Sequence, residues 1–312
     1  MTRNPATLAY LAVLIGVFGH STSEFVAVLT GVFGPEVSVW RYTLGGAGLV
    51  LFALARPVTR DFWRPLIERP VQIMLLSVFG IGMPMLLFHW SLDYATVIQV
   101  ATLTTTIPIW TAVINSAVNK EPLGAGKIFT GFAAFVGIVV LLTDGYIERL
   151  AGDSDQLFGL FLALACSAAG SAYAVLVKPV IQTYGGIRVI ALNTAIGGIA
   201  LWLVVGAAWG VWVDPTTLFD RPAGEAAALI TIGIWNTTIG MLLWFWGLSA
   251  VPDIARGSYL FFLKPVIAAG LSLALLSQPV SWLQFVAIIV ICGSVAIEFF
   301  WPRLSGRAEQ GG

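Results

Sequence analysis

An internal repeat places the strongest constraint on how this chain can fold. The stretch MLLFHWSLDYA begins at Met85 and the stretch MLLWFWGLSAV begins at Met241, with five identical positions in register. Each stretch is followed by two prolines spaced 14 residues apart, which are Pro108 and Pro122 in the first copy and Pro265 and Pro279 in the second. A repeat at nearly constant offset indicates a duplicated unit, so we expect the chain to consist of two similar halves.

The composition excludes a water-soluble protein. Of the 312 residues, 58% are hydrophobic and only 10% are charged, whereas a soluble domain carries roughly 25% charged residues. The formal net charge is +0, so the chain lacks the basic face that nucleic-acid binding requires. Both cysteines, Cys166 and Cys292, lie within apolar runs, which favours a packing role over a disulfide framework. We expect an integral membrane protein in contact with the lipid bilayer, with no cofactor, no metal and no nucleic-acid partner.

Ten apolar runs are long enough to cross about 30 Å of hydrocarbon. They cover residues 8–30, 37–55, 71–91, 95–118, 125–143, 157–178, 189–212, 225–249, 254–276 and 281–301. The alternation of period two that an outer-membrane barrel needs is absent from the sequence. The first run is too long for a signal peptide and lacks a persuasive cleavage site, so we expect a retained helix. The predicted fold is an all-α membrane protein with ten transmembrane helices.

The basic residues predict how these helices are oriented. If the N-terminus is cytoplasmic, twelve Lys and Arg residues fall inside, three fall outside, and Lys264 lies within the membrane. The positive-inside rule therefore favours a multi-pass protein of the cell inner membrane with both termini cytoplasmic. Each half contains five helices, an odd number, so the second half is expected to be inverted relative to the first. The predicted units are a first repeat at 1–146, a second repeat at 157–302 and a cytoplasmic tail at 303–312.

Three ionisable residues inside the apolar runs are the main candidates for a substrate site. A charge at the centre of a transmembrane helix costs about 2.5–3.5 kcal/mol, so each needs a partner or a hydrated cavity. Lys264 lies near the middle of its run, and Pro265 after it disturbs the helical hydrogen bonds. Glu24 and His20 are four residues apart and share a helical face, where they could bind substrate or transfer a proton. Lys264 either binds a substrate carboxylate or forms an internal ion pair with Glu24, and both interpretations are open.

Further residues are secondary candidates. We expect Asn236, Trp110 and Tyr259 to contribute to substrate binding, although Asn236 could equally bond a neighbouring helix. Arg41 and His89 are placed at an outer vestibule, with an interfacial anchor and a local cap as the alternatives. The threonines before Pro108 are expected to bond back to their own helix. Helix bends are predicted at three prolines, namely Pro84, Pro108 and Pro265.

Several stretches resemble a known family. They are LLFHWSLDYATVIQVATLTTTIP with the KEPLGAGK loop after it, GFAAFVGIVVLL, and the counterparts LLWFWGLSAVPDIARGSYLFFLKP and SQPVSWLQFVAIIVICGSVAI. The pattern is similar to the EamA branch of the drug/metabolite transporter superfamily, over nearly the whole chain. The resemblance implies ten helices in two inverted five-helix repeats and a secondary carrier that exports amino acids, amines or other small metabolites. The first helix carries GHSTSEF where that branch often has a Trp-Gly-x-Asn-like step, so no particular substrate is transferred.

The predicted function is an inner-membrane secondary transporter that exports a small polar, amino-acid-like or amine-like metabolite by alternating access. Proton coupling through Glu24 and His20 is a possible addition, and a zwitterion would satisfy both Glu24 and Lys264. An uptake permease for carboxylates is the alternative, and a non-transporting receptor or scaffold is a further one. An intramembrane enzyme is disfavoured because neither GxSxG nor HExxH occurs, and nucleotide-driven transport because GxxxxGK[ST] is missing. The sequence leaves open whether the protein is a monomer or a homodimer.

Overall fold

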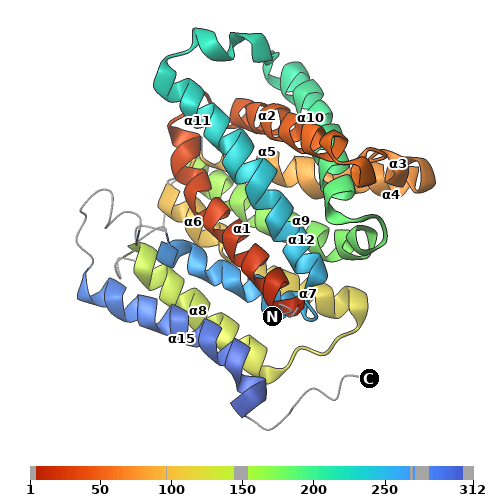
Figure 1. Cartoon of the computed structure of the whole chain (residues 1–312). Coiled ribbons are helices and arrows are strands. Elements are labelled where there is room, and N and C mark those ends of the chain that lie inside the picture. The colour runs from red at the N-terminus through yellow and green to blue at the C-terminus, as the bar shows by residue number, and fades with distance from the viewer. Residues whose placement is uncertain (1–4, 96, 144–153, 268–269, 271–280, 305–312) are drawn as a thin grey trace.

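The computed structural model describes residues 5–95, 97–143, 154–267, 270 and 281–304, and the elements assigned within these ranges are all helical. Figure 1 shows the helices gathered into one bundle, with α8 and α15 lying side by side along one edge. Pro279 and the loop expected between the halves lie outside the described residues, as does most of the predicted tail.

The first half of the chain forms helices α1 to α8. Helices α1 (Pro5–Val28) and α2 (Gly34–Ala55) are followed by the short elements η1 (Pro57–Thr59) and α3 (Arg64–Glu68). A continuous helical rod then comprises α4 (Pro70–Leu75), η2 (Leu76–Gly82) and α5 (Met83–Ser91). The half ends with α6 (Val97–Thr104), α7 (Ile107–Asn119) and α8 (Ala125–Thr143).

The second half contains the elements from α9 to α15. It begins with α9 (Ser154–Tyr184), α10 (Gly186–Trp209) and the short η4 (Pro215–Asp220). A second continuous rod comprises α11 (Ala223–Gly233), η5 (Ile234–Met241) and α12 (Leu242–Ala250). The remaining elements are α13 (Ile254–Ser258), η6 (Tyr259–Leu263) and α15 (Trp282–Leu304).

Six of the described helices are long and apolar enough to cross a membrane, and two shorter apolar helices accompany them. The six cover Pro5–Val28, Gly34–Ala55, Pro70–Ser91, Asp155–Tyr184, Gly186–Trp209 and Ala223–Ala250. The all-α membrane fold is therefore confirmed. The count of ten transmembrane helices and the inverted order of the halves stay predictions. The run expected at 95–118 is interrupted, since α6 ends at Thr104 and α7 begins at Ile107.

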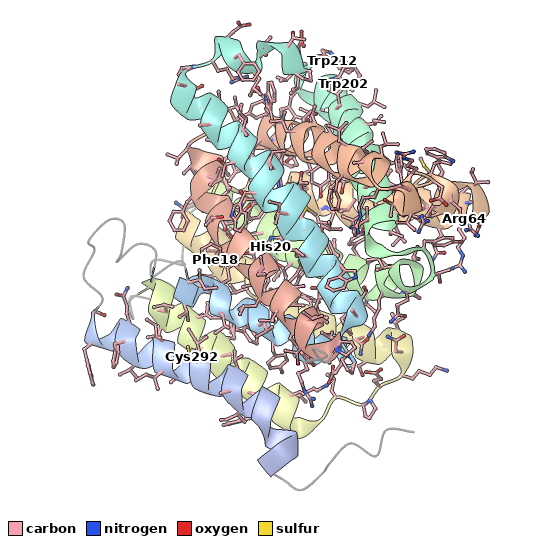
Figure 2. All side chains as sticks on the ribbon, in the orientation of Figure 1. Phe18, His20, Arg64, Trp202, Trp212 and Cys292 are labelled. Atoms are coloured by element: carbon pink, nitrogen blue, oxygen red, sulfur yellow. The ribbon has the colours of Figure 1, made fainter. Side chains whose placement is uncertain are left out.

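The outer surface of the bundle is strongly apolar. Side chains such as Leu51, Phe132 and Phe161 are each about two-thirds exposed on different helices. Figure 2 shows Cys292 on the outer side of α15 and Arg64 at the far end of the bundle. Exposed apolar surface of this extent is unusual for a water-soluble monomer and suits contact with lipid.

Both rods of the repeat change helix type close to the repeated methionines. In η2 and in η5 the backbone is π-helical, and each rod returns to α-helix in α5 and α12. Such π-helical stretches are rare and often occur near functional sites. The three prolines expected at helix bends also lie at such changes. Pro84 and Pro108 are in the first turns of α5 and α7, and Pro265 follows the 3₁₀-helical η6.

The break between α6 and α7 keeps its polar groups bonded. Thr104, Thr105 and Thr106 donate their hydroxyls to the carbonyls of Ala101, Thr102 and Leu103 at 3.1, 2.6 and 2.6 Å. These bonds confirm the expectation that the threonines bond back to their own helix, which compensates for backbone partners lost at the break.

Close contact between the halves is made by α1 and the rod η5–α12. A Cβ placed on Gly16 of α1 would lie 2.8 Å from the backbone nitrogen of Trp244 in α12. Likewise, a Cβ on Gly19 would lie 3.2 Å from the Cα of Gly240. Small residues thus let the two helices approach closely, and both helices contribute residues to the lining of a central cavity.

Candidate functional site

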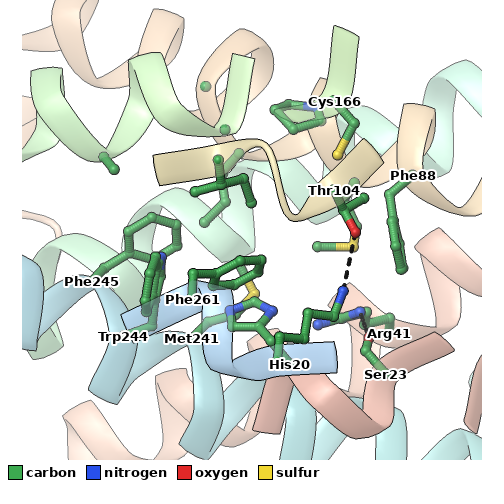
Figure 3. A pocket seen from close by; sticks show the side chains of 18 of the residues that line it. His20, Ser23, Arg41, Phe88, Thr104, Cys166, Met241, Trp244, Phe245 and Phe261 are labelled. Atoms are coloured by element: carbon green, nitrogen blue, oxygen red, sulfur yellow. Dashed lines mark hydrogen bonds between the residues drawn. The ribbon is translucent and has the colours of Figure 1, made fainter. Parts of the chain in front are cut away.

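A cavity lies in the middle of the bundle and is lined by residues from both halves of the chain. It offers about 90 Å³ to the centres of water-sized molecules, which is room for several waters. Its polar lining comprises His20, Ser23, Arg41, Thr104 and Lys264. Figure 3 shows Trp244, Phe245 and Phe261 gathered on one side, and Arg41, Ser23 and Thr104 on the other. The cavity therefore has an apolar end and a polar end.

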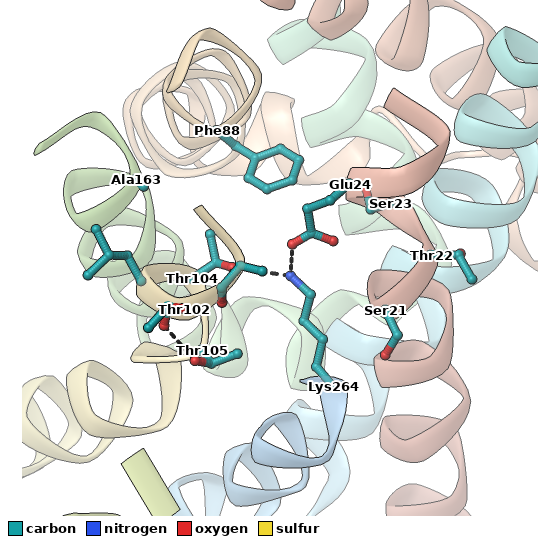
Figure 4. A network of polar contacts seen from close by, with 12 residues as sticks. Ser21, Thr22, Ser23, Glu24, Phe88, Thr102, Thr104, Thr105, Ala163 and Lys264 are labelled. Atoms are coloured by element: carbon teal, nitrogen blue, oxygen red, sulfur yellow. Dashed lines mark hydrogen bonds and ion pairs between the residues drawn. The ribbon is translucent and has the colours of Figure 1, made fainter. Parts of the chain in front are cut away.

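Lys264 and Glu24 form an ion pair beside this cavity. The Lys264 Nζ donates to Oε1 of Glu24 and to the Thr104 hydroxyl, the latter at 3.1 Å (Figure 4). The two charged side chains are 5% and 2% exposed, so the pair is buried. The Lys264 ammonium also lies 5.4 Å from the centre of the Phe261 ring, within cation–π range. Of the two interpretations left open by the sequence, the structure shows the internal ion pair.

The pair connects three separate segments. Glu24 belongs to α1, Thr104 is the last residue of α6, and Lys264 follows η6 in the second half. Removing one partner of such a buried pair leaves an uncompensated charge. The relative position of these segments is therefore coupled to the charge state of two side chains.

Arg41 is a buried residue that lines the cavity. The sequence places it near the start of a helix, but α2 begins at Gly34, about two turns earlier. The residue is 1% exposed. Its Nε donates to Oγ1 of Thr237 at 2.8 Å, and its Nη1 to Oγ of Ser23 at 2.6 Å. Its Nη2 lies 3.5 Å from the backbone oxygen of Asn236. Residues of α1 and η5 therefore supply acceptors for this guanidinium inside the bundle, whereas the sequence suggested an outer vestibule or an interfacial anchor.

His20 lines the cavity, and within the described ranges no hydrogen bond joins it to Glu24, its expected partner on α1. Its ring contacts Trp244 and Phe261, with centroids 5.8 and 5.6 Å apart. Its Nε2 is buried without a hydrogen-bond partner in the part of the chain that the structure describes. An imidazole nitrogen without a partner next to a cavity is available to a ligand.

Four other predicted residues lie outside the cavity lining. Asn236 joins η5 to α1, because its Nδ2 donates to the Gly19 carbonyl at 2.5 Å and to Oγ1 of Thr22 at 2.9 Å. His89 is fully buried and its Nδ1 lies 2.8 Å from Oγ of Ser38, so it joins α5 to α2 instead of lining a vestibule.

Trp110 and Tyr259 are the other two. Trp110 is partly buried on α7, and Tyr259 donates its hydroxyl to the backbone oxygen of Lys127 on α8. Neither residue is among those that line the cavity. Their positions indicate packing and helix–helix contacts, so the structure gives no support to a substrate-binding role for them.

Several lining residues were not predicted as site residues. Ser23 and Thr104 look like ordinary helix hydroxyls in the sequence, and Cys166 and Met241 like core residues. Phe88 and Phe245 lie within the repeated stretches, just ahead of the repeated tryptophans. The repeat was thus a usable signal for part of the lining, whereas nothing in the sequence marked Ser23 of α1 or Thr104 of α6 as cavity residues.

These features define a class of protein. The chain is a multi-pass membrane protein, because it forms a bundle of membrane-length apolar helices. The buried, partly charged cavity between its halves is an arrangement found in carriers of small solutes. The chain belongs to the EamA-like transporter family, whose sequence profile matches it twice, at residues 7–143 and 157–300.

Known relatives agree with this assignment. The chain is similar to the uncharacterized transporter YyaM of Bacillus subtilis, with 23% identity over 263 residues, covering 82% of this chain and 81% of YyaM. It is also similar to an uncharacterized transporter of Clostridium kluyveri, with 21% identity over 72% of this chain and 70% of that protein. A crystal structure with 19% sequence identity covers 95% of this chain and 98% of its own, with a TM-score of 0.78. This last likeness shows a shared fold.

Proposed function

We propose that the protein is a secondary transporter that moves a small polar metabolite through the membrane by alternating access, with the central cavity as its binding site. The cavity itself carries this proposal. It is buried, it holds ionised side chains, and its walls come from α1, α2 and α5 of the first half and from α9 and α12 of the second. Rocking one half against the other would open it first to one side and then to the other.

The inverted orientation of the halves and the cytoplasmic position of both termini are part of this proposal. They are supported by the distribution of basic residues and by the two separate family matches. Residence in the cell inner membrane and export as the direction of net flux follow from the family resemblance. Uptake of carboxylates is the second candidate, which the two cationic side chains at the cavity favour.

Proton coupling would act through the Glu24–Lys264 pair. Protonation of the Glu24 carboxyl removes its negative charge and frees the Lys264 ammonium from its partner. The segments that carry the two residues would then be able to separate. His20, with its unbonded Nε2 in the same cavity, is a second group that could accept a proton.

A screen of labelled solutes tests the proposal. Amino acids, amines and carboxylates would be measured for efflux from overexpressing cells, and then for flux in liposomes containing the purified protein without ATP. Flux in liposomes is the expected result, and Lys264→Ala and Glu24→Gln should lose most of it. Arg60→Gln is the matched control, because Arg60 is exposed, lies outside the cavity lining and donates to the backbone oxygen of Leu54.

Two results would contradict the proposal in different ways. Wild-type flux in both cavity variants would remove the site assignment and leave the transporter assignment standing. A protein that releases bound solute but never carries it into liposomes would instead be a receptor or scaffold.

A further inference from the structure

The charges around the cavity do not balance. Arg41 and Lys264 are cations, and Glu24 is the one carboxylate among the described lining residues and their hydrogen-bond partners. His20 adds no negative charge in either protonation state. The two cations and one anion leave a net charge of at least +1 in a buried space, where an unneutralised charge is costly.

The unbalanced charge belongs to Arg41. Lys264 is neutralised by direct contact with Glu24, whereas the acceptors of Arg41 are two hydroxyls and a backbone carbonyl. No ion pair joins Arg41 to a carboxylate in the described part of the chain. A guanidinium has five N–H donors, and three are used here. The remaining two match the number that one carboxylate accepts in a bidentate pair.

We infer that the transported solute is an organic anion, held by its carboxylate on Arg41 and by an apolar body against the aromatic end of the cavity. This inference rests on the proposed transport function and names the substrate class of the same site. The apolar body packs against Trp244, Phe245 and Phe261, which line one side of the cavity (Figure 3). The ring of His20 lies against Trp244 and Phe261, and its Nε2, which has no hydrogen-bond partner in the described part of the chain, can bond a polar group where the solute carries one.

The same arrangement disfavours solutes with an ammonium group. Glu24 already holds Lys264, so an incoming ammonium finds no free carboxylate among the described cavity residues. A net positive site also repels a cation. Amino acids and amines should therefore bind more weakly than an anion of the same size, which departs from the zwitterionic substrate suggested by sequence.

Three probes with one aromatic body and different charges test this inference. They are 3-phenylpropionate, phenylalanine and phenethylamine. Each probe is tested with the wild-type protein in two assays, one for binding and one for flux. Binding is read from the thermal stability of the purified protein in detergent, and flux from uptake into liposomes with protein-free liposomes as background. We expect 3-phenylpropionate to bind and to be carried, phenylalanine to bind more weakly, and phenethylamine to have no effect.

Variants of Arg41 provide the second part of this test. Arg41→Gln should weaken 3-phenylpropionate binding about tenfold or more, as expected for loss of a charge-assisted bond. Arg41→Lys keeps the positive charge but loses the planar, bidentate donor geometry of the guanidinium, and it should retain an intermediate affinity. Arg60→Gln, an exposed arginine outside the cavity, is the control and should bind as the wild type does. The comparison of probes on wild-type protein stands even if an Arg41 variant fails to fold.

The outcomes separate this inference from the proposed function. Binding or flux of phenylalanine or phenethylamine in preference to 3-phenylpropionate overturns the anion inference and leaves transport intact. Failure of all three probes to bind also overturns it. Binding of 3-phenylpropionate without flux supports the anion site and contradicts the transport function.

Discussion

At the scale of single residues, the Lys264–Glu24 pair predicts a characteristic pattern of stability. Lys264→Met or Glu24→Gln alone leaves a buried partner unpaired, and each should lower the free energy of unfolding by about 3–5 kcal/mol. The double variant removes both charges and should lose clearly less than the sum. Thermal unfolding in detergent measures the difference. Strictly additive losses would show that the two side chains do not interact in the folded protein.

A second residue-scale prediction concerns Gly16. A Cβ at this position meets backbone atoms of Trp244 at 2.8 and 2.9 Å, which cannot move without moving α12. Gly16→Ala should therefore destabilise the protein by about 1–3 kcal/mol, as overpacking typically does. Gly224→Ala is the control, because nothing lies within 4 Å of a Cβ there. Equal melting temperatures for the two variants would contradict the close approach of α1 and α12.

The sequence identified some site residues and misplaced others for a physical reason. Lys264 and Glu24 stand out in the sequence because a charged residue is rare in an apolar run. Recognising them requires no knowledge of which residues surround them in the fold. Arg41 was misplaced because its depth depends on where α2 begins. The Gly34 backbone N–H donates to Oδ1 of Asp93 at 2.8 Å, a contact across 59 residues. Sequence periodicity does not reveal such long-range contacts. It does not reveal the hydrogen-bond partners of His89 and Asn236 either, which also lie on other helices.

At the scale of secondary-structure elements, Asp253 connects two helices at their ends. Its Oδ2 accepts from Nζ of Lys127 in α8 at 2.6 Å, and its Oδ1 caps α13 by accepting from the Arg256 backbone N–H at 3.0 Å. Burial raises the pKa of this carboxyl, but the bonds from Lys127 and Arg256 outweigh burial and leave the pKa below its usual value. The carboxylate form is therefore stabilised by folding.

This shift predicts a pH dependence with a definite sign. Because the folded pKa of Asp253 is lowered, its contribution is complete above the usual carboxyl pKa and is lost as the pH falls through the folded value. Asp253→Asn keeps a good helix cap and removes the charge, so it should cost about 1 kcal/mol at pH 7. The cost should fall as the pH drops through the folded pKa of Asp253, because the wild-type carboxyl then becomes protonated too.

Asp214→Asn is the matched control for this experiment. Asp214 also caps a short helix, by accepting from the Thr216 backbone N–H at 2.9 Å, and no ion pair in the described ranges involves it. Hydrogen bonds from Thr216 also hold the pKa of Asp214 below its usual value, but no ion pair is broken, so Asp214→Asn should lower the melting temperature less at pH 7 than Asp253→Asn does. A stability cost of Asp253→Asn that stays the same as the pH is lowered from 7 through the folded pKa would show that the ion pair is not its cause.

Element boundaries were predicted where composition marks them and missed where backbone geometry decides them. The apolar runs found at 71–91 and 125–143 correspond closely to Pro70–Ser91 and Ala125–Thr143. The interruption between α6 and α7 was only hinted at, through the threonines before Pro108. The π-helical stretches η2 and η5 had no sequence marker, since they depend on how each rod packs against its neighbours.

At the scale of the whole molecule, the repeat was the most informative part of the sequence. It led to two halves, and the family profile matches the chain as two separate segments. What it could not supply is the way in which the halves are joined. Besides Glu24–Lys264, three ion pairs join the halves in the described part of the chain, and one of them is Asp61–Arg188. The other two lie at opposite ends of the expected topology. Lys127 in the first half pairs with Asp253 in the second, and Glu36 in the first half pairs with Arg221 in the second.

These two links predict a test of alternating access. The topology expected from the basic residues places the Lys127–Asp253 link inside and the Glu36–Arg221 link outside. A carrier that opens to each side in turn must break each link at some stage of its cycle. Cysteine pairs at either link, joined by a short bifunctional thiol reagent, should therefore abolish transport. Both native cysteines are replaced beforehand, because Cys166 lines the cavity and Cys292 is exposed.

A pair within one half supplies the control for this cross-linking. Arg64 and Glu68 are joined by an ion pair of 2.6 Å within α3, so cross-linking cysteines there should leave transport unchanged. Reagent-free protein gives the reference rate for each pair. If flux persists after complete cross-linking at one link, that face does not open during the cycle. If flux persists at both, the halves do not rock against each other, and the solute must reach the cavity by a path within one half.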